Sequence, residues 1–138
     1  MKPHIREIDH VVLRVTDLET MTRFYCDALG CHVEKVQPDL GLVQLRAGKS
    51  LIDLLALGAS GGSPHDCAPG QGHNMDHLCL RVEPFDAAAL RAHLAAHGAR
   101  PGDAERRYGA DGYGPSIYLY DPEGNMVELK GPPQAAAH

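Results

Sequence analysis

The sequence predicts an α+β fold made of two βαβββ modules that pair about a pseudo-twofold axis. The main observation is a phrase used twice: residues 8–15 (IDHVVLRV) return as residues 75–82 (MDHLCLRV), with five of eight positions identical. A helix-like segment and then a glycine, Gly30 or Gly98, follow each copy. Repetition of this kind indicates two copies of one supersecondary unit. The 138 residues are enough for both copies to share a core, so one domain over residues 1–138 is expected.

The first module is expected to span residues 5–57. Residues 5–15 are rich in Ile, Val and Leu and predict its first strand. Thr16 and Glu19 form a capping-box pattern, and apolar residues at helical spacing continue to Gly30, which is expected to end the helix. Three further strands are predicted at residues 31–37, 41–47 and 50–57, and the last two are joined by a turn at 47–49.

The second module is expected to span residues 75–130, after a connector at 58–74 that is mostly Gly, Ser, Pro and His. Pro84 suits the first turn of a helix that runs to about His97. Residues 99–114 carry four glycines and no strand pattern, although the repeat requires a strand there. Strands are predicted at 116–120 and 126–130, with a turn at 121–124 between them and a disordered tail at 131–138.

Composition excludes several classes of partner. The net charge is −5 and no basic cluster is present, which argues against nucleic acid. No apolar run approaches the roughly 20 residues of a membrane span, and no signal peptide opens the chain. A cytoplasmic protein without a membrane partner is therefore expected. The four cysteines have no C-x-x-C spacing and are expected to be free thiols.

Each module carries an acid in its last strand. Residues 51–54 (LIDL) and 126–129 (MVEL) share the pattern apolar, apolar, acid, Leu, which places Asp53 and Glu128 at equivalent positions. With the repeated His10 and His77, the repeat supplies two imidazoles and two carboxylates. Nitrogen and oxygen ligands without a thiolate suit one divalent metal, Zn²⁺, Ni²⁺, Mn²⁺, Fe²⁺ or Co²⁺.

A lone strand histidine is more often a hydrogen-bonded structural residue, but equivalent placement in both copies favours metal ligation by His10, His77 and Glu128. Asp53, with its shorter side chain, is either a fourth ligand or an acid beside the metal. The repeated Asp9 and Asp76 fall on the opposite strand face and are expected at the strand edge or in support of the histidines. Arg14 shares a strand face with His10 and is expected to hold a substrate carboxylate.

The paired modules, together with His10 in IDHVVLRV, His77 in MDHLCLRV and Glu128 in DPEGNMVEL, resemble the vicinal oxygen chelate superfamily, which has the glyoxalase/bleomycin resistance/dioxygenase fold. The resemblance covers residues 5–130. HVVLRVTDL and LIDL are most similar to the ligand strands of glyoxalase I-like proteins. Asp53 stands where a glyoxalase I has Glu, and residues 109–115 do not match a glutathione-binding loop.

The resemblance implies a metal-dependent enzyme similar to lactoylglutathione lyase. Its small substrate, possibly a glutathione adduct, would present two adjacent oxygens to the metal, and Glu128 would move a proton between neighbouring carbons. One alternative is a ring-cleaving extradiol dioxygenase with Fe²⁺ on two histidines and one carboxylate, and a fourth ligand at Asp53 argues against it. Another is a non-catalytic drug- or metabolite-binding protein. The resemblance also implies a homodimer, in which one site draws His10 and Asp53 from one chain and His77 and Glu128 from the other.

Overall fold

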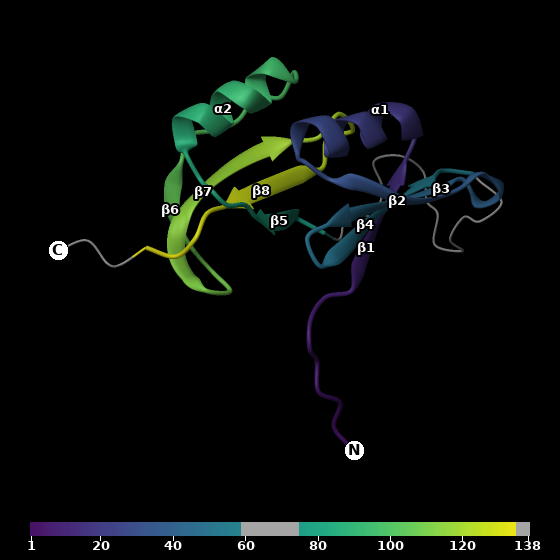
Figure 1. The fold of residues 1–138 in the computed structure, drawn as a ribbon, viewed down its shortest axis with the longest axis horizontal. Coiled ribbons are helices and arrows are strands. Elements are labelled where there is room, and N and C mark those ends of the chain that lie inside the picture. Colours follow the sequence, from purple (N-terminus) through teal and green to yellow (C-terminus); the bar gives the residue numbers. More distant parts are fainter. Residues whose placement is uncertain (59–74, 135–138) are drawn as a thin grey trace. The chain divides into compact units, whose positions relative to one another are not determined.

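A computed structural model describes residues 1–58 and 75–134. Residues 59–74 of the predicted connector and residues 135–138 of the tail lie outside the described residues. The chain divides into two compact units, Met1–Ala68 and Pro69–His138, and each has its own four-stranded sheet (Figure 1). The order of elements in each unit confirms the predicted α+β class and the two repeated βαβββ modules.

The first unit has the sheet order β1-β4-β3-β2. Strand β1 runs parallel to β4, whereas β3 is antiparallel to both β4 and β2. A π-helical segment, η1, continues α1, and a short 3₁₀ turn, η2, precedes β3. The elements are β1 (His10–Val15), α1 (Leu18–Arg23), η1 (Phe24–Ala28), β2 (His32–Gln37), η2 (Pro38–Leu40), β3 (Leu42–Ala47) and β4 (Ser50–Ala56).

The second unit repeats this topology with the sheet order β5-β8-β7-β6. Strand β5 is parallel to β8, and β7 is antiparallel to both β8 and β6. Helix α2 lies over one face of this sheet (Figure 1). The elements are β5 (His77–Arg81), α2 (Ala87–Ala96), β6 (Glu105–Gly109), β7 (Gly112–Tyr120) and β8 (Met126–Lys130).

Strand alternation separates core residues from site residues. In β4, Ile52 and Leu54 are buried in the core, and the intervening Asp53 points to the opposite face. In β8, Val127 and Leu129 belong to the core in the same way, and Glu128 lies on the opposite face. Each acid is therefore held by apolar neighbours on both sides, and those neighbours fix the strand's orientation.

Strand β1 begins at His10, so the strand predicted from residue 5 is five residues too long at its start. In the described part of the chain β1 pairs with β4 alone, β4 starts at Ser50, and the register pairs His10 with Leu51. The start of β4 still contacts the two residues before β1: the Leu51 N–H donates to the Asp9 carbonyl at 3.0 Å, and the Ser50 hydroxyl donates to the Ile8 carbonyl at 2.7 Å. The strand pairing does not continue to residues 5–8, and Ile5 and Ile8 are exposed despite their strand-favouring side chains.

Asp17, rather than the predicted Thr16, caps α1. Its carboxylate accepts hydrogen bonds from the backbone N–H of Thr20 at 3.0 Å and from the Thr20 hydroxyl at 2.8 Å. These bonds lower the pKa of Asp17. Gly30 ends the helical segment as predicted, with a φ of 85° that suits glycine.

We expect Asp17→Ala to lower the urea midpoint of unfolding, because loss of the cap leaves the first-turn N–H of Thr20 without its acceptor. Urea unfolding monitored by circular dichroism measures the change. Glu7→Ala, at an exposed position before β1, is the control and should leave the midpoint unchanged. Equal midpoints for the two variants would contradict the assignment of Asp17 as the cap.

The second unit differs from prediction in two places. Helix α2 starts at Ala87 after its N-cap Asp86, so Pro84 precedes the helix instead of lying in its first turn. Residues 105–109 form β6, which the repeat required but the local sequence did not reveal, because Arg and Glu side chains follow no apolar alternation there. Strand β7 also extends back to Gly112, beyond the predicted start at 116.

The described part of the tail is ordered against β7, which corrects the predicted disorder for residues 131–134. The backbone N–H of Gly131 donates to the carbonyl of Pro115, and that of Gln134 donates to the carbonyl of Tyr113, each at 2.8 Å. Within residues 1–58 and 75–134 no helix is long and apolar enough to cross a membrane. Cys26, Cys31 and Cys79 are free, as predicted, and Cys67 lies outside the described residues.

Candidate functional site

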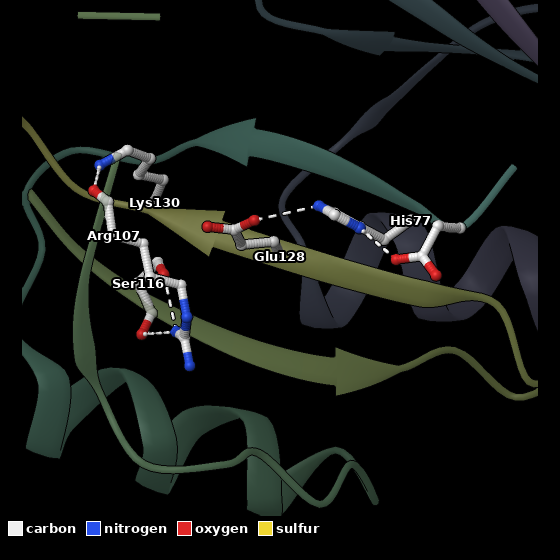
Figure 2. Close-up of polar contacts among 6 residues, drawn as sticks. His77, Arg107, Ser116, Glu128 and Lys130 are labelled. Carbon is white, nitrogen blue, oxygen red and sulfur yellow. Dashed lines mark hydrogen bonds and ion pairs between the residues drawn. The ribbon is translucent and has the colours of Figure 1, made fainter. Parts of the chain in front are cut away.

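His77 and Glu128 are in contact on one face of the second sheet. They lie on the parallel neighbours β5 and β8, where the register pairs Cys79 with Glu128, and His77, two residues before Cys79, lies on the same face. The Nε2 atom of His77 is 3.2 Å from Oε1 of Glu128, whose side chain is 7% exposed (Figure 2). Two predicted ligands of the second module are thus in direct contact.

The other ring nitrogen of His77 faces a second carboxylate, Asp76, with Nδ1 at 2.7 Å from Oδ2. A neutral imidazole has one N–H, so it can donate to only one of these acids. If the ring is neutral and Nδ1 donates to Asp76, the Nε2 lone pair faces Glu128, and a cation between these two electron-pair donors would stabilise the contact. Ligands about 2.0–2.2 Å from one metal lie about 3 Å apart, so the His77–Glu128 pair fits a divalent metal.

The first unit holds the equivalent residues. His10 Nδ1 lies 2.8 Å from Asp9 Oδ1, as in the Asp76–His77 pair. The hydrogen bond to Asp9 and the charges of Asp53 and Asp9 raise the pKa of His10. The β1–β4 register pairs Val12 with Asp53, which places Asp53 on the same sheet face as His10.

Asp53 is 4% exposed, and its two oxygens differ. Oδ2 accepts a hydrogen bond from Gln44 Nε2 at 3.2 Å, whereas Oδ1 has no hydrogen-bond partner in the described part of the chain. A buried carboxylate oxygen without a partner is costly. A metal ion at Oδ1 would remove that cost, so Asp53 fits the role of ligand.

The structure thus brings the four predicted metal residues together as two pairs, one in each unit. Among the residues it describes, no group of three or more His, Cys, Asp or Glu side chains is arranged so that it could hold a metal ion. The joining of both pairs, His10 with Asp53 and His77 with Glu128, in one metal centre therefore stays a prediction. Each pair has the imidazole and carboxylate chemistry that suits a divalent first-row metal.

Aromatic and basic side chains surround Glu128. Tyr118 is its register partner on β7 and meets His77 edge to face, with ring centroids 5.4 Å apart. Burial, the charge of Glu128 and a hydrogen bond to Glu128 raise the pKa of Tyr118. The Arg107 guanidinium lies 4.3 Å from the centre of the Tyr118 ring and donates to the hydroxyl of Ser116 at 2.8 Å (Figure 2).

Lys130 is 7% exposed and crosses the same face of the sheet. Its Nζ donates to the backbone carbonyl of Arg107 at 2.8 Å, which ties β8 to β6 across β7 (Figure 2). A Cβ at Gly109 would lie 2.5 Å from Lys130 Cε, so glycine there leaves room for the lysine stem. A positive charge therefore lies two residues beyond Glu128 on the same strand face.

A sequence model of the glyoxalase/bleomycin resistance protein/dioxygenase superfamily matches residues 7–129. The chain belongs to this superfamily. The match confirms the predicted family and includes all four predicted metal residues. The described units, each a four-stranded sheet with the βαβββ order, agree with it.

Individual relatives are epimerases and a virulence protein. The ethylmalonyl-CoA/methylmalonyl-CoA epimerase of Cereibacter sphaeroides is 32% identical over 134 residues, covering 91% of this chain and 98% of the relative. The mitochondrial methylmalonyl-CoA epimerase of Mus musculus is 31% identical over 130 residues, covering 89% of this chain and 71% of the relative. The crystal structure of virulence protein STM3117 from Salmonella typhimurium is 26% identical with a TM-score of 0.78, covering 94% of this chain and 99% of that one.

The two repeated arginines of this superfamily member have different surroundings. Arg14 lies on the His10 face of β1, opposite Leu55, and its role in substrate binding stays a prediction. Arg81 pairs with Asp111 at 2.6 Å and Glu83 at 2.9 Å, so its charge is compensated within the second unit.

Sequence reasoning missed Gln44 and Tyr118, the cross-strand partners of the two acids. Counting outward from the predicted turns at 47–49 and 121–124 places Val43 opposite Asp53 and Ile117 opposite Glu128, one residue away from the observed partners Gln44 and Tyr118. An error of one residue in the turn therefore hid both partners. The contact of Arg107 with Tyr118 was hidden as well, because β6 has no apolar pattern.

Proposed function

We propose that this protein is a divalent-metal-dependent enzyme that moves a proton at a carbon next to a carbonyl group, in the manner of glyoxalase I-like isomerases and lyases. A 2-alkylmalonyl thioester of coenzyme A is its first candidate substrate. The observation that carries the proposal is the arrangement around His77, whose two ring nitrogens face Asp76 and Glu128 at 2.7 and 3.2 Å. The epimerase relatives support the choice of substrate.

The metal residues would be His10, Asp53, His77 and Glu128, binding one Zn²⁺, Ni²⁺, Mn²⁺, Fe²⁺ or Co²⁺. When bound, such a cation supplies Lewis-acid stabilisation of negative charge that develops on substrate oxygens. The unpartnered Oδ1 of Asp53 and the close Nε2–Oε1 pair of His77 and Glu128 support this set.

The chain's own groups have separate tasks. Asp9 and Asp76 accept the Nδ1 proton of the two histidines and keep each Nε2 lone pair available. Glu128 is the proton carrier: its carboxylate takes the proton from the substrate carbon as the C–H bond breaks and the electron pair moves towards the carbonyl oxygen. In an epimerisation a second acid, for which Asp53 is the candidate, would return a proton to the opposite face of that carbon, and Glu128 would release the abstracted proton to solvent. Arg14 would bind the substrate carboxylate.

The lyase alternative uses the same proton transfer, between adjacent carbons of a glutathione hemithioacetal. Both isomerase readings need carboxylates beside the metal, and the buried Asp53 supplies a second one. A ring-cleaving dioxygenase needs open coordination positions for a catechol and O₂, and ligation by Asp53 disfavours that reaction. A drug-binding role has no use for two repeated His–acid pairs.

Solvent exchange tests the proposal. The metal-loaded protein is incubated in D₂O with (2R)- or (2S)-methylmalonyl-CoA, with the glutathione hemithioacetal of methylglyoxal, and with catechol under air. We expect deuterium at C2 of methylmalonyl-CoA and interconversion of its epimers, both lost in Glu128→Gln. Exchange only with the hemithioacetal would favour the lyase. Absence of exchange in both, at full metal loading, would contradict the proposed proton transfer.

We also expect a homodimer, because each sheet ends in edge strands, β1 and β2 in one and β5 and β6 in the other, that a twofold partner can cover. Light scattering at micromolar concentration measures the mass, and a monomer would contradict the prediction.

If one site takes His10 from one chain and Glu128 from the other, mixing the inactive His10→Ala and Glu128→Gln variants should restore activity. Continued inactivity of a confirmed mixed dimer would place each site within one chain.

A further inference from the structure

Among the described residues, only one of the two carboxylate oxygens of Asp53 accepts a hydrogen bond. Oδ2 accepts from Gln44 Nε2 at 3.2 Å, whereas the buried Oδ1 has no hydrogen-bond partner in the described residues. A single donor on one side of a carboxylate sets the direction of the other oxygen. The partner of Asp53 therefore determines where Oδ1 points.

Gln44 is itself fixed by a third residue. Gln37 Nε2 donates to Gln44 Oε1 at 3.3 Å. Because the amide oxygen of Gln44 accepts from Gln37, its NH₂ group faces Asp53. If the Gln44 amide were flipped, its oxygen would face the Asp53 carboxylate oxygen and its NH₂ group would face the NH₂ group of Gln37, and both contacts would be unfavourable. The three side chains come from the neighbouring strands β2, β3 and β4, so the chain of contacts spans three of the four strands of the sheet.

The repeat places a donor at the same position in the second unit. Gln44 pairs with Asp53 across β3 and β4, as Tyr118 pairs with Glu128 across β7 and β8. Tyr118 lies across from its acid and has the Arg107 guanidinium of β6 stacked on its ring. In both units a residue of the outer strand thus contacts the cross-strand partner of the carboxylate.

We propose that Gln44, locked by Gln37, is a positioning residue that presents Oδ1 of Asp53 to the divalent cation. The inference rests on the proposed metal centre and adds two glutamines to it. Gln44 does not contact the cation or the substrate in this scheme, and its whole effect passes through Asp53. Loss of Gln44 lets the Asp53 carboxylate rotate and lowers the contribution of Asp53 to metal affinity.

The test measures metal binding in Gln44→Met, Asp53→Asn and the double variant, by calorimetry with Zn²⁺ and by the visible spectrum of the Co²⁺ form. Loss of a residue that orients a ligand lowers metal affinity by about 10–100-fold. We expect that loss in Gln44→Met and a smaller one in Gln37→Met. In the Asp53→Asn background, Gln44→Met should cause no further loss, because it acts only through Asp53. The Co²⁺ spectrum of Gln44→Met should shift towards that of Asp53→Asn.

Gln134→Met is the matched control: it makes the same substitution at an exposed position in the other unit and should keep wild-type affinity. Urea unfolding of every variant separates loss of fold from loss of metal binding. If Gln44→Met does not fold, Gln37→Met tests the proposal in its place, because it leaves both Gln44 and Asp53 in the protein. Wild-type affinity and spectrum in Gln44→Met would overturn the positioning role and leave the metal centre standing. A wild-type protein that binds neither metal would overturn both.

Discussion

His10→Ala, His77→Ala and Glu128→Gln are each expected to lower metal stoichiometry well below one per site and to reduce proton-transfer activity by about 10²–10⁴-fold. The reason is that Nε2 of His77 and Oε1 of Glu128 are in contact, as two ligands of one cation would be, and each substitution removes one proposed ligand of the centre. Glu128→Gln also removes the proposed proton carrier while keeping the size of the side chain. Plasma emission spectrometry on protein purified without added metal measures occupancy.

The matched controls are His32→Ala and Glu7→Gln, both at exposed positions, and they should retain metal and activity. Full occupancy in any two of the three site variants would contradict the ligand set. Retained metal with lost activity in Glu128→Gln alone would keep the centre but limit Glu128 to proton transfer.

Asp121→Ala is expected to lower the free energy of unfolding by about 2–3 kcal/mol, because half-buried N–H groups that donate to its charged carboxylate would lose their acceptor. Asp121 is 4% exposed and ties the turn before β8 together. Its Oδ1 accepts from the backbone N–H groups of Glu123 and Asn125, each at 2.9 Å, and its Oδ2 accepts from the Asn125 side chain at 2.8 Å. Because this turn leads into β8, Glu128 should lose its alignment with His77 as well.

Urea unfolding and metal affinity of Asp121→Ala together measure both effects. Lys49→Ala, in the exposed turn before β4, is the control and should change stability by less than about 0.5 kcal/mol. A stability loss in Asp121→Ala as small as that of Lys49→Ala would show that the three hydrogen bonds are dispensable.

The repeat made most of the fold predictable. The Asp-His phrase located β1 and β5, and the acid-bearing strands located β4 and β8 within a residue or two. Errors arose where a neighbouring strand decides the outcome: Ile5 and Ile8 favour a strand, yet the pairing of β1 with β4 begins only at His10. Strand β6 escaped because its pattern of Arg and Glu has no apolar period, and it is held by pairing with β7.

The candidate site was predictable to the level of residue pairs. Equivalence in the repeat selected the four candidate metal residues, and the structure places each histidine on the same sheet face as its acid. The contacts that tune them required knowledge of three-dimensional position. That Asp53 keeps one oxygen unpartnered, or that Arg107 stacks on Tyr118, depends on side-chain directions across three strands.

The alternation of apolar and charged side chains in β8 selects the register in which the strand pairs during folding. Val127 and Leu129 fill the core on one face while Glu128 lies on the other. A slip of one residue would drive the carboxylate into the apolar core and expose both aliphatic side chains, and burial of an unpaired carboxylate is far more costly than exposure of a methyl group. A misregistered β8 is thus disfavoured by the same carboxylate that we propose as the proton carrier.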